Sequence, residues 1–144
     1  MAGGGLRTAM SINRLETHPI HLGLGARALA QPEFPHDERA MQWYADYGER
    51  NAEDGNEGRL VSMYHFTEDW SGWEMHPAGD EVVVCLSGTL ELIQELPDGE
   101  TRTTRLEAGE YAINPAGVWH TANVADAASS RFITAGMGTQ HRPR

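Results

Sequence analysis

Short apolar runs separated by glycine and proline fill the chain beyond residue 58, which is the pattern of an all-β domain. Residues 81–86 are nearly continuous valine and apolar on both faces, as in a strand that is covered on both sides. Residues 90–96 and 101–106 flank a Pro-Asp-Gly turn and predict a hairpin. Four more strands are predicted at 60–66, 111–114, 118–124 and 131–135. Strands this short and this closely spaced predict a β-sandwich or barrel.

One short helix is predicted before these strands, near residues 38–47. Its apolar positions follow the i, i+3, i+4, i+7 spacing of one helical face: Ala40, Trp43, Tyr44 and Tyr47. Asp37 is a suitable N-cap, and Gly48 is expected to end the helix. The aromatic stripe predicts a face packed on the core, with a ligand-lining face as the alternative.

Residues 1–33 show little regular spacing of apolar residues. Residues 1–33 predict an irregular, glycine-rich extended arm, with pairing to another strand as the alternative. Since neither a linker nor a repeat divides the chain, we expect one structural domain in two parts. Residues 1–57 would supply the arm, the short helix and an acidic loop packed on the barrel, and residues 58–144 the barrel with a C-terminal tail. The histidines of the first part are expected to be exposed: His18, His21 and His36.

Composition narrows the range of partners. The 144 residues carry a formal net charge of −10, and all 11 basic side chains are arginine. This balance argues against nucleic acid or an anionic membrane as a partner, because either would need a concentrated basic surface. The absence of lysine removes Schiff-base chemistry and the Walker A phosphate loop. A single cysteine excludes an internal disulfide, and no apolar run suits a signal peptide or a membrane span, so a cytoplasmic location is expected.

The residues that could bind a metal lie in two stretches of the predicted strands. Glu74 and His76 are two residues apart and therefore project from the same face of a strand. Glu81 opens the next strand after a Pro-Ala-Gly-Asp turn, and His120 follows a Pro-Ala-Gly turn at another strand start. If the two stretches are neighbours in a barrel, two imidazoles and two carboxylates converge. Such a set suits Fe(II), Mn(II), Zn(II) or Ni(II).

These two stretches resemble the motifs of the cupin superfamily, in particular its small single-domain, conserved-barrel members. The first motif, G-x5-H-x-H-x3–4-E-x6-G, fits from His76 through Glu81 to Gly88, and the second, G-x5-P-x-G-x2-H-x3-N, fits from Gly109 to His120. The resemblance covers residues 58–136. It implies a double-stranded β-helix, or jelly-roll barrel, that often forms a homodimer and holds a divalent metal ion through Glu74, His76, Glu81 and His120.

The sequence departs from the family pattern at two positions. Glu74 stands where the first motif has its first histidine, and Val124 stands where the second motif ends in asparagine. A carboxylate oxygen at position 74 can still ligate a metal. The alternatives for Glu74 are a general base or an acceptor that orients His76.

Other residues near the two motifs have expected roles as well. Asp80 is an alternative ligand to Glu81, although the spacing to Gly88 favours Glu81. His65 is expected to be a hydrogen-bonded structural residue, with a barrel-facing polar residue as the alternative. Cys85 is expected to be a small buried hydrophobe. The basic tail, residues 138–144, is expected to close the barrel mouth, to bind a neighbouring subunit or to fray.

Two classes of function follow. The first is a metal-dependent enzyme that acts on a small molecule in the barrel as an oxygenase, isomerase or decarboxylase. The second is a non-catalytic module that binds or senses a small molecule or the metal itself. A fold that is used this widely does not name a reaction.

Overall fold

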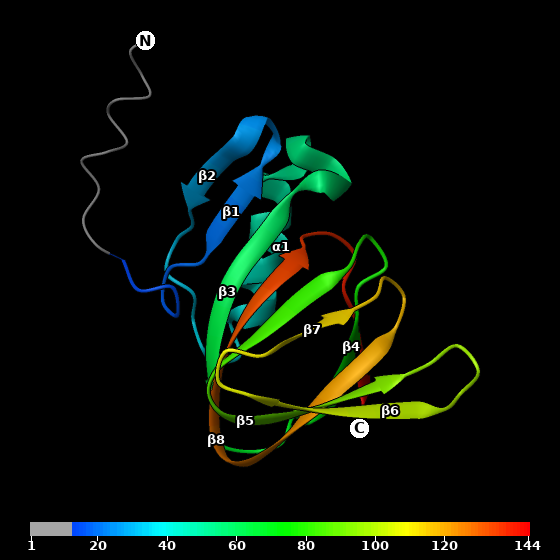
Figure 1. Cartoon of the computed structure of the whole chain (residues 1–144). Coiled ribbons are helices and arrows are strands. Elements are labelled where there is room, and N and C mark those ends of the chain that lie inside the picture. The colour runs from blue at the N-terminus through cyan, green and yellow to red at the C-terminus, as the bar shows by residue number, and fades with distance from the viewer. Residues whose placement is uncertain (1–12) are drawn as a thin grey trace.

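In the computed structural model of the chain, the described residues 13–144 form strands, one α-helix and two short 3-10 segments (Figure 1). The predicted arm begins in residues 1–12, which lie outside the described residues. The strands are β1 (Ile20–Gly23), β2 (Arg27–Ala30), β3 (Arg59–Phe66), β4 (Gly72–Met75), β5 (Glu81–Glu95), β6 (Thr101–Glu107), β7 (Tyr111–Asn114), β8 (Trp119–Ala135) and β9 (Gln140–Pro143). The helical segments are α1 (Ala40–Arg50), η2 (Leu24–Ala26) and η3 (Ala52–Glu57).

These strands join into one open, antiparallel sheet that curls over on itself into a jelly-roll barrel (Figure 1). One path through the sheet runs β2-β1-β3-β8-β4-β9, and β5 pairs with β6, β7 and β8. The all-β prediction is confirmed.

Two long strands, β5 and β8, form the centre of the sheet. The sequence predicted two shorter strands in place of each, because Ser87 and Gly88 interrupt the first apolar run and the segment 125–130, with Asp126 and two serines, interrupts the second. The β5–β8 pairing instead continues across two register shifts, between Cys85 and Ser87 and between Gly88 and Leu90. Gly88 has φ +70°, and a Cβ there would lie 1.9 Å from the carbonyl oxygen of Ala127. Glycine therefore lets the strands bend without ending.

The main core lies inside the barrel, on the inward faces of β5 and β8. Leu90, Val83 and Cys85 are fully buried there, so the prediction of a buried, apolar Cys85 is confirmed. Tyr64, Phe66 and Trp70 pack against the same cluster from one side. The buried members of the cluster are Val83, Cys85, Leu90, Leu106, Ala122, Val124, Ala128 and Phe132.

A second, aromatic cluster joins α1 to β3. Phe34, Trp43, Tyr47 and Leu60 are buried together, and the Trp43 and Tyr47 rings stack 5.7 Å apart. The aromatic stripe of the helix therefore packs as core. The helix begins at Ala40 and continues past the expected stop at residue 48.

The region before the helix is more ordered than sequence analysis predicted. Instead of an irregular arm, β1 and β2 form a hairpin, and β1 also pairs with β3. This is the alternative in which the arm pairs with another strand. Among the described residues, no helix is long and apolar enough to span a membrane.

Candidate metal centre

Three strands bring the four predicted ligands together. Glu74 lies on β4, His76 follows the end of that strand, Glu81 begins β5, and His120 lies near the start of β8, opposite Glu74 in the sheet register. The loops that carry the two motifs are also tied to each other. The Gly117 amide donates a hydrogen bond to the His76 carbonyl, with an N–O distance of 3.0 Å.

Asp80, the alternative ligand, helps to join these two loops and does not face the metal position. Its Oδ1 accepts a hydrogen bond from the Ala116 backbone amide at 2.8 Å, on the exposed side of the turn. The contact holds the turn before β5 against the turn before β8. The preference for Glu81 over Asp80 therefore agrees with the positions of the two side chains.

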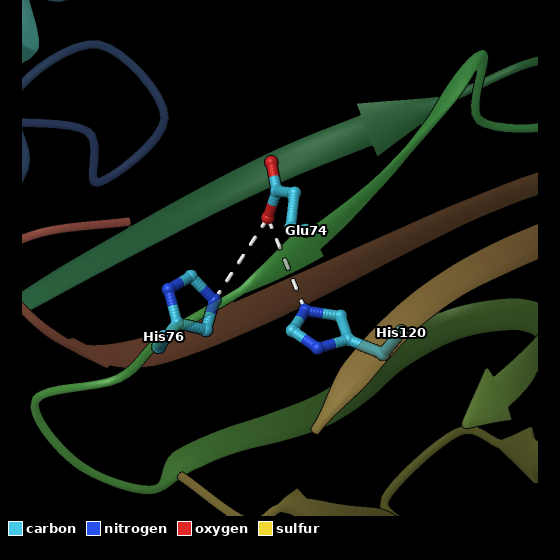
Figure 2. Close-up of side chains that lie close together, drawn as sticks. All are labelled: Glu74, His76 and His120. Atoms are coloured by element: carbon cyan, nitrogen blue, oxygen red, sulfur yellow. Dashed lines mark ion pairs between the residues drawn. The ribbon is translucent and has the colours of Figure 1, made fainter. Parts of the chain in front are cut away.

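Glu74, His76 and His120 present their ligand atoms to one point (Figure 2). One oxygen, Glu74 Oε2, lies 3.9 Å from His76 Nε2 and 3.9 Å from His120 Nε2, and the three atoms are all within 4.8 Å of one another. Both histidines are buried, whereas the Glu74 side chain is 34% exposed. The site is thus closed on the imidazole side and open past Glu74.

Glu81 lies against both imidazoles from the buried side. Its Oε2 is 3.1 Å from His76 Nε2 and its Oε1 is 3.1 Å from His120 Nε2. Each of these oxygens also accepts a hydrogen bond, Oε1 from Asn114 Nδ2 at 3.0 Å and Oε2 from Thr134 Oγ1 at 2.6 Å. These two bonds fix the orientation of the carboxylate.

The other ring nitrogens of the two histidines are already engaged. His120 Nδ1 lies 3.4 Å from the Val118 carbonyl oxygen, which can only accept, so Nδ1 donates this contact and the neutral ring would carry its lone pair on Nε2. His76 Nδ1 lies 2.9 Å from Thr139 Oγ1. Neither Nε2 atom has a well-aligned hydrogen-bond partner among residues 13–144, although both are buried. Buried, unpartnered nitrogens beside carboxylates are the donor set that a divalent metal requires.

The contacts of Glu81 with the two histidines also shift the pKa values of Glu81 and His120. Burial acts to raise the pKa of Glu81, but the two adjacent imidazoles outweigh it and hold that pKa below its ordinary value. Burial acts to lower the pKa of His120, and the Glu81 carboxylate outweighs it and raises that pKa. The site therefore binds positive charge, whether this arrives as protons or as a metal ion.

His141 is a neighbour of the cluster that sequence analysis did not select. Its Nε2 lies 3.5 Å from Glu74 Oε1, and the contact raises the pKa of His141. In the sequence it belongs to the basic tail and to neither motif.

Two tyrosines also lie within electrostatic range of the carboxylates. The hydroxyls of Tyr44 and Tyr64 are hydrogen-bonded to each other. Burial is the main cause that raises the pKa of Tyr44 to about 12, and the charges of Glu74 and Glu81 add to it. Helix α1 thus contributes a phenol to the surroundings of the site.

A separate buried cluster surrounds His21, which was wrongly predicted to be exposed. His21 Nδ1 lies 2.6 Å from the Tyr47 hydroxyl, and its Nε2 lies 2.6 Å from Asp54 Oδ2. Arg27 binds the other Asp54 oxygen at 2.6 Å. These bonds link β1, α1 and η3, so the cluster fastens the N-terminal hairpin to the helix.

His65 lies outside the barrel, where its Nδ1 is 2.8 Å from Ser129 Oγ. It is therefore a hydrogen-bonded surface residue. Two pockets lined by described residues lie beside other parts of α1. One of about 10 Å³ includes His21 and a groove of about 340 Å³ includes Trp43, and neither contains any of the four predicted ligands.

Comparisons with known proteins agree with this architecture. The family model described as a cupin domain matches residues 62–136. An oxalate oxidase aligns with 56% of this chain and 44% of its own, with a TM-score of 0.50 and 16% identity. An oxalate decarboxylase from Bacillus subtilis, studied for its Mn(II) centres, aligns with 67% of this chain and 26% of its own, with a TM-score of 0.52 and 14% identity.

Peruvianin-I, a cysteine peptidase from Thevetia peruviana latex, aligns with 59% of this chain and 56% of its own, with a TM-score of 0.50 and 17% identity. A search of curated protein sequences gave no match. The chain thus corresponds to about half, or less, of the length of these structural relatives. At such identities the likeness shows the jelly-roll fold alone, which confirms the predicted fold class.

Proposed function

This chain belongs to the cupin family, and from that premise we propose that it binds one divalent metal ion and acts on a small molecule. Glu74, His76, Glu81 and His120 are the proposed ligands. The ion would be Fe, Mn, Zn or Ni, since imidazole and carboxylate together suit each of these. The Mn(II) centres named for the oxalate decarboxylase make Mn(II) the first ion to test.

The observation that carries the proposal is the pair of buried Nε2 atoms that face Glu81 without a well-aligned hydrogen bond. Each nitrogen lies 3.1 Å from a carboxylate oxygen that already accepts another hydrogen bond. A lone pair facing a carboxylate in a buried site is unfavourable unless a positive charge lies between them. Two carboxylates would neutralise a divalent ion, so the filled site carries no excess charge.

When bound, the ion would polarise an oxygen of the substrate or activate O₂. The four proposed ligands would have two different roles. His76, Glu81 and His120 are buried and held by hydrogen bonds, so they are fixed ligands. Glu74 is half-buried on the solvent side, where its carboxylate can complete the ligand set or take a proton from the substrate. The proposed reaction is of the oxygenase, isomerase or decarboxylase type.

A second candidate is a non-catalytic module that binds or senses the metal or a small molecule. One observation favours it. Three of the four proposed ligand side chains, those of His76, Glu81 and His120, are buried. Access to the metal would then be confined to the side of Glu74, which favours binding over turnover.

Substitution of the histidines tests the proposal. His76→Ala and His120→Ala each remove a nitrogen donor, so we expect both variants to lose the metal, whereas His65→Ala, a matched surface histidine, retains it. The protein is purified without a metal-affinity tag, and its metals are measured by elemental analysis. O₂ consumption is then screened with small acids and phenols.

Stoichiometric metal with substrate-dependent O₂ uptake favours the enzyme, while stoichiometric metal with no turnover favours the binding module. Undiminished metal in both histidine variants would overturn the metal centre.

A further inference from the structure

The segment that follows β8 returns to the proposed metal centre. Strand β9 pairs antiparallel with β4, with His141 opposite Glu74 and Arg142 opposite Trp73. Directly opposed residues of an antiparallel pair project on the same face of the sheet. His141 is therefore on the metal side of β4, and Arg142 is on the other side.

Two residues of this segment contact two different proposed ligands. Thr139 Oγ1 lies 2.9 Å from His76 Nδ1, and His141 Nε2 lies 3.5 Å from Glu74 Oε1. In both cases the contact is to the ligand atom that faces away from the metal position. The remaining atoms, His76 Nε2 and Glu74 Oε2, are the two that lie 3.9 Å apart at that position (Figure 2).

One arginine, Arg142, holds this segment in place. The Arg142 guanidinium contacts the faces of two indole rings, 5.0 Å from the centre of Trp73 and 4.6 Å from that of Trp119. It also pairs with Glu95, with an N–O distance of 2.5 Å. Guanidinium groups stacked on aromatic faces and paired with a carboxylate are rigidly placed. The register that sets His141 opposite Glu74 is thus fixed from the far side of the sheet.

We propose that residues 139–144 form a strap that belongs to the metal centre, with Thr139 and His141 as positioning residues for His76 and Glu74. The inference rests on the proposed function. The strap holds the His76 ring in one orientation and engages one Glu74 oxygen, so that Glu74 offers only the other oxygen to the metal. An imidazole from β9 thereby supports a carboxylate at the position where the family motif has a histidine.

Mn(II) binding by the full chain tests the strap, with the affinity measured by calorimetry and the coordination measured by electron paramagnetic resonance. Loss of an outer hydrogen-bond partner typically weakens metal binding by 10–100-fold. We expect His141→Ala and Thr139→Val each to weaken Mn(II) binding by about tenfold and to change the spectrum. His141→Gln and Thr139→Ser keep a hydrogen-bonding group and should restore both.

Gln140→Ala is the matched control, because Gln140 lies on the same strand, is exposed and opposes Met75. It should bind Mn(II) as the parent does. Parent-like affinity and spectra in both His141→Ala and Thr139→Val would overturn the strap while leaving the proposed function intact. A parent protein that binds no divalent metal, tested also with Fe(II), Zn(II) and Ni(II), would overturn both.

Discussion

Glu74 is half-exposed, unlike the other three proposed ligands. Its role, as a ligand or as a general base, can therefore be tested separately from theirs. Its two oxygens face different groups, one toward the buried imidazoles and one toward His141. A ligand and a general base would both sit in this position. They differ in what happens to the metal when the carboxylate is replaced.

We expect Glu74→Gln to weaken Mn(II) binding by about tenfold, a smaller loss than His76→Ala, because the amide keeps the shape but removes the charge. Glu74→His restores the usual family motif and should retain metal, with a shift in preference toward Ni(II) and Cu(II), which favour imidazole. Competition between Mn(II) and Ni(II), measured by elemental analysis, tests both variants. Full metal content in both, with loss of turnover alone, would identify Glu74 as a base.

Motif spacing was enough to select the four side chains of the candidate site, since each lies within a few residues of a turn that the sequence marks with proline or glycine. It could not select Thr139 or His141. Their positions depend on the pairing of β9 with β4, which is fixed by the contacts of Arg142 with two tryptophans distant in the sequence. His21 was missed for a similar reason, because Tyr47 and Asp54, which bury it, lie far along the chain.

Strands β5 and β8 are longer than the apolar runs in their sequences predict. Residues between the two apolar halves of β5 include Ser87 and Gly88, which on sequence grounds end a strand. Pairing with β8 nevertheless continues on both sides of this point, and β5 also pairs with β7 along its first half and with β6 along its second. Tertiary pairing therefore overrides the local signal. Strands β1 and β2 were missed because each has only four residues and weak alternation.

Replacing Gly88 tests the bend in β5. Gly88→Ala places a Cβ 1.9 Å from the Ala127 carbonyl oxygen at φ +70°, so we expect it to lower the free energy of unfolding by about 3 kcal/mol or more. Gly99→Ala is the matched control, because Gly99 also has positive φ but has no atom within 4 Å of the new Cβ. It should cost only about 1 kcal/mol. Denaturant unfolding measures both, and equal losses would show that the bend tolerates a side chain.

The whole architecture could be predicted only in part from periodicity. Alternation and turns predicted an all-β barrel, and the two motifs, through their resemblance to cupins, specified the jelly roll. The division into residues 1–57 and 58–144 remains our proposal. The aromatic cluster of Phe34, Trp43 and Leu60 lies across that division and joins both parts.

A homodimer also remains a prediction, and β7 is the surface that we propose for it. Tyr111 is 65% exposed and Ile113 is 50% exposed, and they lie two residues apart on one face of a strand that, within residues 13–144, pairs only with β5. An apolar face at a free edge is suited to a second copy of the same strand. With a net charge of −10 per chain, repulsion opposes association, so the dimer should tighten as salt rises.

Light scattering at micromolar concentration, in low and high salt, measures this equilibrium. We expect Ile113→Glu to weaken the dimer by at least about tenfold, because each interface would bury two like charges. Met41→Glu is the matched control, since Met41 is also an exposed apolar residue, 61% exposed, but lies on α1. A strict monomer in the parent at both salt concentrations would contradict the dimer. A dimer equally weakened by Met41→Glu would place the interface elsewhere than β7.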